Sequence, residues 1–130
     1  MSPNGFSAAL TKLRERRTLS GRELSKLADV DHAYESRLES GEKVNPSDEI
    51  IDKLLRGLKL KTNDRDALLL RYLAKYPDTK ADYVTYVLDE PSVTIDEFTV
   101  GASMVNRGNA PAPAVIVERV RKILAEESGE

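Results

Sequence analysis

The stretch TLSGRELSKLADVDHAYESRLESG, residues 18–41, carries the start and stop signals of two short helices. Ser20 is followed three residues later by Glu23, which is the spacing of a capping box at a helix start. Asp31 can accept the free amide hydrogens at the start of the next helix, and Gly41 permits the left-handed turn that ends it. The inward apolar face of the first helix is supplied by Leu24, Leu27 and Ala28. We therefore expect two helices joined by a tight turn.

Helix signals continue on both sides of this pair. Before it, residues 6–17 place apolar side chains at helical spacing and end in cations: Phe6, Leu10 and Leu13, then Arg14, Arg16 and Arg17. After it, residues 47–58 begin with a serine and two acids, and their apolar stripe consists of Ile50, Ile51, Leu54, Leu55 and Leu58. The same periodicity predicts helices over residues 63–76, over residues 79–88 and from residue 114 onward.

Residues 91–108 fit two kinds of secondary structure. Thr94 and Glu97 have the spacing of a capping box, whereas Val93, Ile95 and Thr99 favour a strand. We expect a helix here, which makes the fold class all-α. The composition GNAPAP predicts a linker near residues 107–113.

Composition excludes several functional classes. The chain of 130 residues has no cysteine, so disulfides, thiolate nucleophiles and cysteine-based zinc sites are not available to it. Its apolar runs are short, and its first residues carry no basic segment before an apolar one, so we expect neither a signal peptide nor a membrane span. These features are typical of a protein of the reducing cytoplasm. No motif indicates a cofactor.

The net charge of −2 hides a difference between the two halves of the chain. Residues 1–61 hold 12 Lys and Arg against 10 Asp and Glu, whereas residues 62–130 hold 8 against 12, which gives balances of +2 and −4. Because phosphate binding depends on a local basic face rather than on the total charge, the first half remains a candidate for binding nucleic acid.

Two helices joined by a tight turn form a helix-turn-helix, whose second helix can place side chains on base edges in the major groove. An ordered set of residues extends beyond this motif: Leu13-Arg14, Leu19-Ser20, Glu23-Leu24, Leu27-Ala28, Val30, Ser36-Arg37-Leu38-Glu39, Gly41, Pro46-Ser47 and Leu54. In these residues the chain resembles the Cro and phage-repressor family, also called the xenobiotic-response-element (XRE) family, over about residues 6–60. The resemblance implies a lambda-repressor-like DNA-binding domain of about five helices over residues 1–62. Residues 63–130 are then a C-terminal helical extension for dimerisation or for binding a partner or effector.

The resemblance also assigns roles to individual residues. The third helix would read DNA bases through His32, Ala33 and Arg37, with Tyr34 and Ser36 beside them. Phosphate contacts would come from Ser20, Arg22, Lys43 and Asn45. A partly buried ion pair between the first and third helices would be formed by Arg14 and Glu39. The chemistry agrees with this mapping, since arginine can bind guanine through two hydrogen bonds and alanine can meet a thymine methyl group.

Three positions are unusual against this background. The family usually has an aliphatic residue at the position of Glu35 and a glycine at the position of Asp29. A buried carboxylate without a partner is costly, so we expect Glu35 to reach solvent or a cation such as Arg37. With Asp31, these acids should weaken non-specific DNA binding. Gly57 lies in a helical interior, where glycine costs about 1 kcal/mol unless close packing requires it.

Other readings of the same side chains are less favoured. His32 with Ser36 suggests a hydrolytic site, and His32 with Asp31 and Glu35 suggests a metal site. An exposed short helix offers no pocket or oxyanion hole, and one histidine with flexible carboxylates is a poor metal site, so we expect neither.

Two sets of side chains beyond residue 62 are candidates for other contacts. Four tyrosines are more typical of core or interface positions than of an effector pocket: Tyr72, Tyr76, Tyr83 and Tyr86. The apolar seam of the last helix is the candidate surface for a second copy or a partner protein: Ile116, Val120, Ile123 and Leu124.

We therefore expect a sequence-specific transcriptional regulator that binds double-stranded DNA, a repressor acting as a homodimer on a pseudo-palindromic operator, and not an enzyme. Two alternatives stay open. The acidic second half would suit the antitoxin of a toxin–antitoxin pair, which regulates its own promoter and neutralises a toxin through residues 63–130. The acids around the third helix would suit a protein-interaction adaptor that has lost DNA binding.

Overall fold

The computed structural model describes residues 4–105 and 111–127, which form eight α-helices and no strand. All-α architecture is thus confirmed. The helices are α1 (Gly5–Arg16), α2 (Gly21–Ala28), α3 (His32–Ser40), α4 (Asp48–Gly57), α5 (Arg65–Lys75), α6 (Ala81–Asp89), α7 (Ile95–Val105) and α8 (Pro113–Glu127).

The helix boundaries in the first half follow the capping signals of the sequence. The Ser20 side chain accepts a hydrogen bond from the Glu23 amide at 3.1 Å, and the Glu23 carboxylate accepts one from the Ser20 amide at 2.8 Å. Asp31 caps α3 by accepting a hydrogen bond from the Tyr34 amide at 3.1 Å. Gly41 ends α3 with a positive φ of 85°. These side chains satisfy backbone groups that the helices themselves leave free.

Most of the ambiguous segment 91–108 is helical, since Ile95–Val105 form α7, and residues 106–108 lie outside the described residues. Thr94 and Glu97 exchange two hydrogen bonds, Thr94 N–H to Glu97 Oε1 at 3.0 Å and Glu97 N–H to Thr94 Oγ1 at 3.1 Å. This capping box starts α7, so the local cap outweighs the strand preference of the neighbouring β-branched residues.

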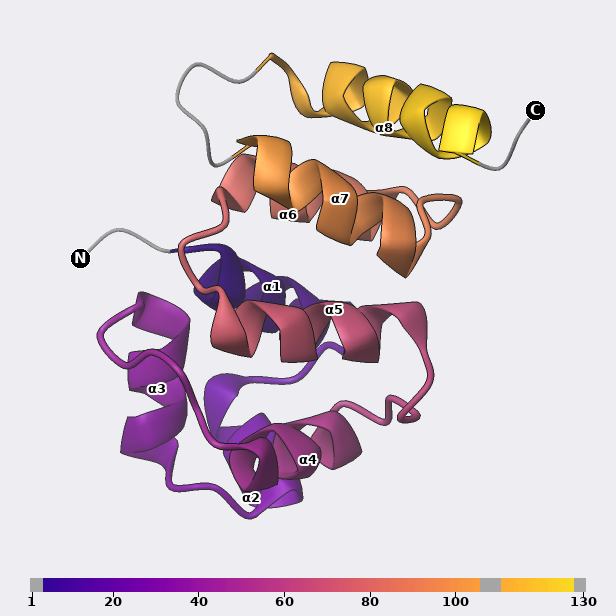
Figure 1. The fold of residues 1–130 in the computed structure, drawn as a ribbon. Helices are drawn as coiled ribbons and strands as arrows, with labels where there is room; N and C mark the ends of the chain where they lie inside the picture. Colours follow the sequence, from indigo (N-terminus) through magenta and orange to yellow (C-terminus); the bar gives the residue numbers. More distant parts are fainter. Residues whose placement is uncertain (1–3, 106–110, 128–130) are drawn as a thin grey trace.

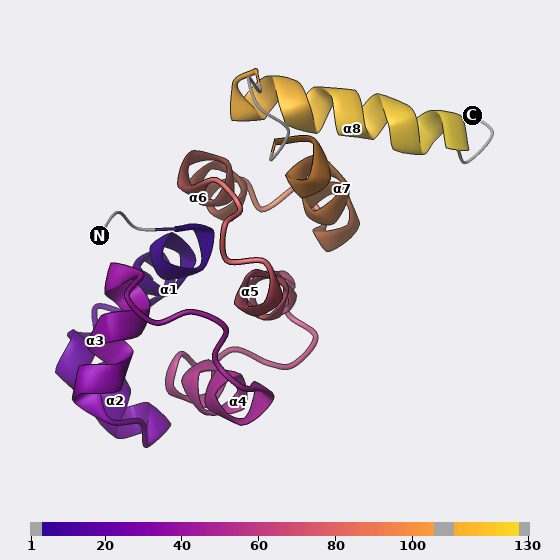
Figure 2. The same cartoon turned by 60° about the vertical axis from the view of Figure 1, so that its left-hand side comes forward.

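The helices are arranged in tiers along the molecule (Figures 1 and 2). Helices α1 and α5 lie in the middle. One end is formed by α2, α3 and α4, and the other by α6, α7 and α8, with α8 outermost. The pair α2 and α3 therefore lies far from α8, which leaves two distant surfaces on one chain.

A single hydrophobic core runs through these tiers, from Phe6 on α1 to Val120 on α8. On the first helices the predicted apolar positions are buried: Phe6, Leu10, Leu13, Ile51, Leu54, Leu55 and Leu58. Ile50 is half-buried against this core, and Leu27 lies outside it with its side chain 54% exposed. Helix α2 packs against α4 and α3 through Leu24, Ser25 and Ala28, and Leu27 lies about 100° around the helix from the centre of that face. The prediction that Leu27 points inward was wrong.

Close packing explains the glycine inside α4. A Cβ on Gly57 would lie 2.9 Å from Leu24 Cδ1, 3.1 Å from Ala28 Cβ and 3.2 Å from the Ala28 amide nitrogen. The absence of a side chain therefore lets α4 approach the end of α2, and this contact sets where α2 sits.

Polar contacts hold the second half of the chain together and join it to the first. Within the second half, Arg65 at the start of α5 donates from Nη1 to the carbonyl oxygens of Val87, Glu90 and Val93, each at 2.9 Å. Lys12 on α1 forms an ion pair with Asp89 at 3.0 Å. The division of the chain at residues 62 and 63 stays a prediction, and most of the predicted linker near 107–113 lies outside the described residues.

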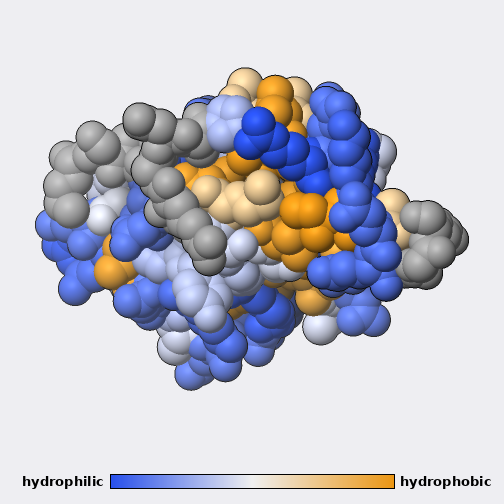
Figure 3. Space-filling model, turned by 45° about the horizontal axis from the view of Figure 1, so that its top comes forward, coloured by the Kyte–Doolittle hydropathy of each residue, from blue (hydrophilic) through white to orange (hydrophobic). Residues whose placement is uncertain are grey.

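The end of the molecule formed by α7 and α8 has a partly exposed apolar face (Figure 3). On α8, Ile116 and Val120 are buried within the chain, whereas Ile123 is 37% exposed and Leu124 is half-buried. Only the second half of the predicted seam is therefore open to a partner. Hydrophobic side chains gather in the middle of the view in Figure 3, with hydrophilic ones around them.

Tyr83 belongs to the core rather than to a pocket. It is buried, its hydroxyl donates to the Phe98 carbonyl oxygen at 2.9 Å, and its ring stacks on Phe98 with centroids 5.4 Å apart. Tyr72 and Tyr76 line an open groove between α4, α5 and α7. Within residues 4–105 and 111–127, no helix combines the length and the apolarity needed to span a membrane.

Candidate nucleic-acid interface

The turn between α2 and α3 is set by one residue in the left-handed conformation. Asp29 has φ 56° and ψ 48° and ends α2, which is a conformation that aspartate tolerates better than most side chains. The next amide, that of Val30, donates back to the Ser25 carbonyl oxygen at 3.0 Å, and the Val30 side chain is buried. The chain therefore turns within three residues, from Asp29 to the cap Asp31, and α3 begins at His32.

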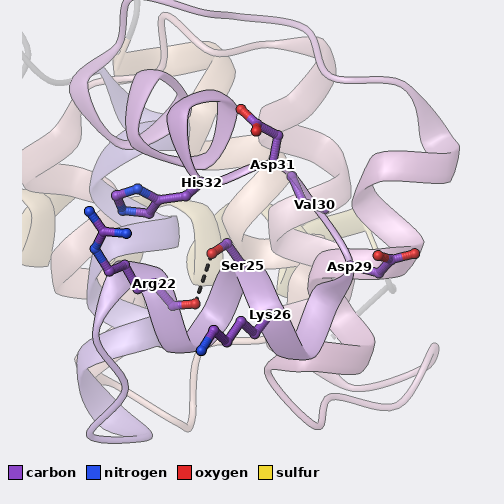
Figure 4. A pocket seen from close by; sticks show the side chains of 7 residues that line it. All are labelled: Arg22, Ser25, Lys26, Asp29, Val30, Asp31 and His32. Atoms are coloured by element: carbon purple, nitrogen blue, oxygen red, sulfur yellow. Dashed lines mark hydrogen bonds between the residues drawn. The ribbon is translucent and has the colours of Figure 1, made fainter.

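A cleft of about 570 Å³ lies at this corner between α2 and α3, and it is open to solvent. It is lined by Arg22, Ser25, Lys26, Asp29, Val30, Asp31 and His32. Figure 4 shows Arg22 and His32 at one end of the cleft and Asp29 at the other. The cleft thus offers two basic side chains, one imidazole and two carboxylates to a ligand.

Lys26 was not among the predicted phosphate contacts. It lies four residues after Arg22, so both cations lie on the same side of α2. That spacing is visible in the sequence and could have identified it.

The predicted base-reading residues lie on one short helix but differ in exposure. Ala33, Ser36 and Arg37 are exposed, whereas His32 and Tyr34 are half-buried. The Arg37 side chain is 51% exposed, and its Nε lies 3.6 Å from Glu42 Oε2. The main candidate for base contact is therefore accessible from solvent, and it is paired with Glu42, an acid that the sequence analysis did not single out.

The predicted phosphate-contacting residues lie around this helix. Ser20 and Arg22 are exposed at the start of α2, and Lys43 and Asn45 are exposed in the loop after α3. The Lys43 amide donates to the Arg37 carbonyl oxygen at 3.0 Å, which holds the loop against the end of α3. These cations and amides surround the exposed face of α3 in the way that a contact to a duplex backbone needs.

Behind this face, Arg14 and Glu39 form a half-buried ion pair between α1 and α3. The Arg14 guanidinium donates to both Glu39 oxygens, with Nε to Oε2 and Nη2 to Oε1 each at 2.9 Å. Thr11 adds a hydrogen bond to Glu39 Oε1 at 2.9 Å, and Arg14 Nη1 donates to the Leu19 carbonyl oxygen at 2.8 Å. Bidentate pairs of this kind combine strength with a fixed geometry, so this pair orients α3 on α1.

Comparison with known proteins agrees with this geometry. A family model described as a helix-turn-helix domain matches residues 6–68. Residues 6–68 are a helix-turn-helix domain. No curated protein and no solved structure matches the chain. The match covers α1 to α4 and the start of α5, so it includes every predicted base and phosphate contact.

Glu35 lies inside the helix-turn-helix domain rather than on its surface. Its side chain is 1% exposed, and its Oε2 atom has no hydrogen-bond partner. The expectation that Glu35 reaches solvent or Arg37 was therefore wrong. The reason is its register on α3: Glu35, Leu38 and Glu39 share the side of the helix that faces α1 and α2, while Arg37 points away from it.

The surroundings of Glu35 favour its neutral form. Burial, then a hydrogen bond with Glu39 and the Glu39 charge, raise the pKa of Glu35 from 4.5 to about 8, against the opposing effect of Arg14. Burial alone would raise the pKa of Glu39 as well, but hydrogen bonds from Glu35, Arg14 and Thr11 outweigh it and lower that pKa. These opposite shifts favour a neutral Glu35 beside an ionised Glu39.

Proposed function

We propose that this chain is a sequence-specific regulator of transcription that binds double-stranded DNA through its helix-turn-helix domain. Within that proposal it acts as a binding protein and not as an enzyme. The supporting observation is the combination of an exposed α3 face, carrying Ala33, Ser36 and Arg37, with Arg22 and Lys26 at the adjoining cleft. In this arrangement α3 reads base edges in the major groove while α2 and the loop after α3 hold phosphates.

We further propose that the regulator is a homodimer and a repressor on a pseudo-palindromic operator. A single DNA-reading helix contacts only one half-site. An operator with two-fold symmetry therefore requires two helix-turn-helix domains held at a fixed distance, about 34 Å or a multiple of it. The partly exposed apolar side chains of α7 and α8 support this, because they lie at the end of the chain opposite α3. A contact there leaves both reading helices free. Repression follows if the bound dimer covers the polymerase site.

One observation favours a second candidate function, a protein-interaction adaptor. Three carboxylates lie beside the exposed face of α3, those of Asp29, Asp31 and Glu42. The distance from Glu42 Oε2 to Arg37 Nε is 3.6 Å. Such acids repel phosphates and weaken non-specific binding. The antitoxin alternative, in which residues 63–130 bind a toxin, keeps DNA binding and adds a partner at the far end.

The test is binding to DNA by fluorescence anisotropy across a salt series. The probes are a labelled duplex from upstream of the protein's own gene and a shuffled duplex of equal length. We expect the full chain to prefer the native duplex, and Arg37→Ala to lose about 1–3 kcal/mol of that preference. Arg22→Ala should weaken binding to both duplexes and reduce the salt slope by about one.

The matched control is Arg56→Ala, which removes the same charge from an exposed position on α4. It should leave the preference for the native duplex unchanged. Absence of binding to either duplex at low salt, in a folded protein, would overturn the regulator and leave the adaptor. Specific binding together with co-purification of a basic protein on residues 63–130 would favour the antitoxin.

A further inference from the structure

Three ionisable side chains meet where α1, α2 and α3 join, and only one of them is a cation. Arg14 comes from α1, and Glu35 and Glu39 come from α3. All three nitrogens of the Arg14 guanidinium are engaged with Glu39 or with the Leu19 carbonyl oxygen. Arg14 therefore neutralises Glu39 and has no donor left for Glu35. If both glutamates were ionised, the site would carry one negative charge without a partner. A buried charge of that kind is expensive unless it is neutralised by a proton.

Glu35 also packs directly against the start of α2. Its Oε1 atom lies 3.0 Å from the position that a Cβ on Gly21 would occupy. The His32 ring also lies near this turn, with Nε2 at 3.7 Å from the same position. The charged residues of the first turn of α2 are Arg22, which is exposed, and Glu23, which is engaged with the Ser20 cap. The charged and titratable groups around this site are therefore Arg14 from α1, Arg22 and Glu23 from α2, and Glu39 and His32 from α3.

The start of α2 is also the place where the proposed function puts a DNA phosphate, held by Arg22 and the amides after Ser20. A phosphate there brings a second negative charge close to the Glu35 carboxyl group. Like charges disfavour the ionised form of a carboxyl group, so bound DNA and ionised Glu35 oppose each other.

We propose that Glu35 is a positioning residue for the DNA-reading helix and that its carboxyl group must be protonated when DNA is bound. Where Glu35 is ionised in the free protein, DNA binding therefore takes up one proton. This inference rests on the proposed function. Protonated Glu35 fills the space between α2 and α3 without a net charge. Ionised Glu35 needs water or a cation, which it gains when the start of α2 and α3 move apart. That movement displaces Arg22 relative to the exposed face of α3.

The experiment measures dissociation constants by anisotropy at pH 6.5, 7.5, 8.5 and 9.0 and constant ionic strength, with the full chain. The probes are the upstream duplex of its own gene and, at low salt, a shuffled duplex. We expect the dissociation constant of the wild type to rise several-fold between pH 6.5 and 9.0, up to tenfold per pH unit for one proton. The raised pKa of Glu35 lies inside this range. In Glu35→Gln, which keeps the shape of the neutral acid, the rise should be at least threefold smaller.

Two controls separate Glu35 from other sources of pH dependence. Glu49→Gln makes the same chemical change on an exposed α4 side chain and should retain the wild-type rise. His32→Asn removes the other titratable group beside Gly21 and should weaken binding at every pH while retaining the rise. Circular dichroism at each pH verifies that each variant is folded. If Glu35→Gln does not fold, Glu35→Leu, which is apolar as in the resembled family, replaces it.

The outcomes are distinguishable. A pH dependence in Glu35→Gln or Glu35→Leu equal to that of the wild type overturns the positioning role while DNA binding stands. A rise that is lost in His32→Asn also overturns it and assigns the proton to His32. Absence of DNA binding by the folded wild type even at pH 6.5 overturns the proposed function and this inference with it.

Discussion

At the scale of single residues, the orientation of α3 depends on the ion pair that Arg14 of α1 forms with Glu39 of α3. Arg14 is committed to Glu39 through two hydrogen bonds of 2.9 Å, and the side chains are only 18% and 13% exposed. Removing one partner of such a pair leaves the other charge poorly solvated, and that cost exceeds the value of an exposed ion pair. The pair is therefore a structural element of the domain and not a DNA contact.

We predict that Glu39→Ala lowers the free energy of unfolding by about 1–3 kcal/mol, because Arg14 and Thr11 lose their shared acceptor. The measurement is thermal unfolding by circular dichroism. Ser40→Ala is the control, since Ser40 is the next residue on α3 and is exposed, and its effect should stay within about 0.5 kcal/mol. Equal melting temperatures for the two variants would contradict the role of the pair.

Glu35 gives the stability of the protein an unusual pH dependence. Its pKa is about 8 in the folded chain against 4.5 ordinarily, so the folded state binds more protons than the unfolded state between these values. The contribution of Glu35 to stability is therefore fully present below about pH 4.5 and is lost as the pH rises to about 8. The lowered pKa of Glu39 changes stability only at pH values below about 4.5, so it does not contribute to the change between pH 4.5 and 8.

We predict that urea unfolding of the wild type gives a lower free energy at pH 8 than at pH 5.5. In Glu35→Gln this difference should become markedly smaller, since glutamine does not titrate. Glu49→Gln serves as the exposed control. Equal differences in wild type and Glu35→Gln would show that Glu35 does not carry a raised pKa.

At the scale of helices, the position of α2 depends on its contact with α4. The glycine of that contact, Gly57, accommodates Leu24 and Ala28 where any side chain would be too close. Leu24 can shift the end of its side chain, but the Ala28 amide nitrogen belongs to the backbone of α2 and moves only with the helix. Since α2 carries Arg22 and Lys26, a displacement of this helix also changes the cleft that we propose to contact DNA.

We predict that Gly57→Ala lowers the free energy of unfolding by about 1–2 kcal/mol. The steric cost of overpacking, about 1–3 kcal/mol, outweighs the gain of about 1 kcal/mol or less in helix propensity. Chemical denaturation measures this effect, and Arg56→Ala on the same helix is the exposed control. A variant more stable than the wild type would show that α2 and α4 can separate without cost.

At the scale of the whole molecule, one core connects the helix-turn-helix domain to the outermost helix. Buried side chains run without interruption from α1 to α8, and Arg65 links α5 to the end of α6. Part of α8 remains uncovered: Ile123 is 37% exposed and Leu124 is half-buried, while Arg121 forms an ion pair with Glu97 of α7 at 3.1 Å. The helix is thus anchored in its own chain along its first half and has an apolar edge along its second.

We predict that Ile123→Arg shifts the protein from dimer to monomer, because a charge at the centre of an apolar contact is left without solvent or partner. Light scattering after size-exclusion chromatography measures the mass of each species. Lys122→Ala, on the neighbouring exposed position, should leave the dimer intact, and both variants should remain folded by circular dichroism. A dimeric Ile123→Arg would place dimerisation elsewhere, and a wild type that is monomeric at tens of micromolar would contradict the dimer.

The local features of the helix-turn-helix domain were predictable from the sequence. Ser20 with Glu23, Asp31, and Gly41 determine helix ends through hydrogen bonds and backbone angles that involve only near neighbours in the chain. Apolar spacing predicted most of the helices, while capping residues predicted α3 and decided the ambiguous segment that contains α7. The assignment of α3 as the helix that reads DNA came from the family resemblance and stays a prediction. Lys26 was missed, although its spacing from Arg22 was visible.

What only the tertiary structure decided depends on contacts between residues distant in the chain. The burial of Glu35, the exposure of Leu27 and the function of Gly57 each depend on how α3, α2 and α4 are rotated against their neighbours. A sequence specifies the spacing of side chains around a helix, but the angle at which a short helix meets its neighbours is set by packing of the whole core. The sequence by itself determined an all-α helix-turn-helix protein and the caps of its helices, because these depend on neighbours in the chain. Packing alone placed a carboxyl group beside a competing carboxylate at the junction of α1, α2 and α3, where burial changes its charge.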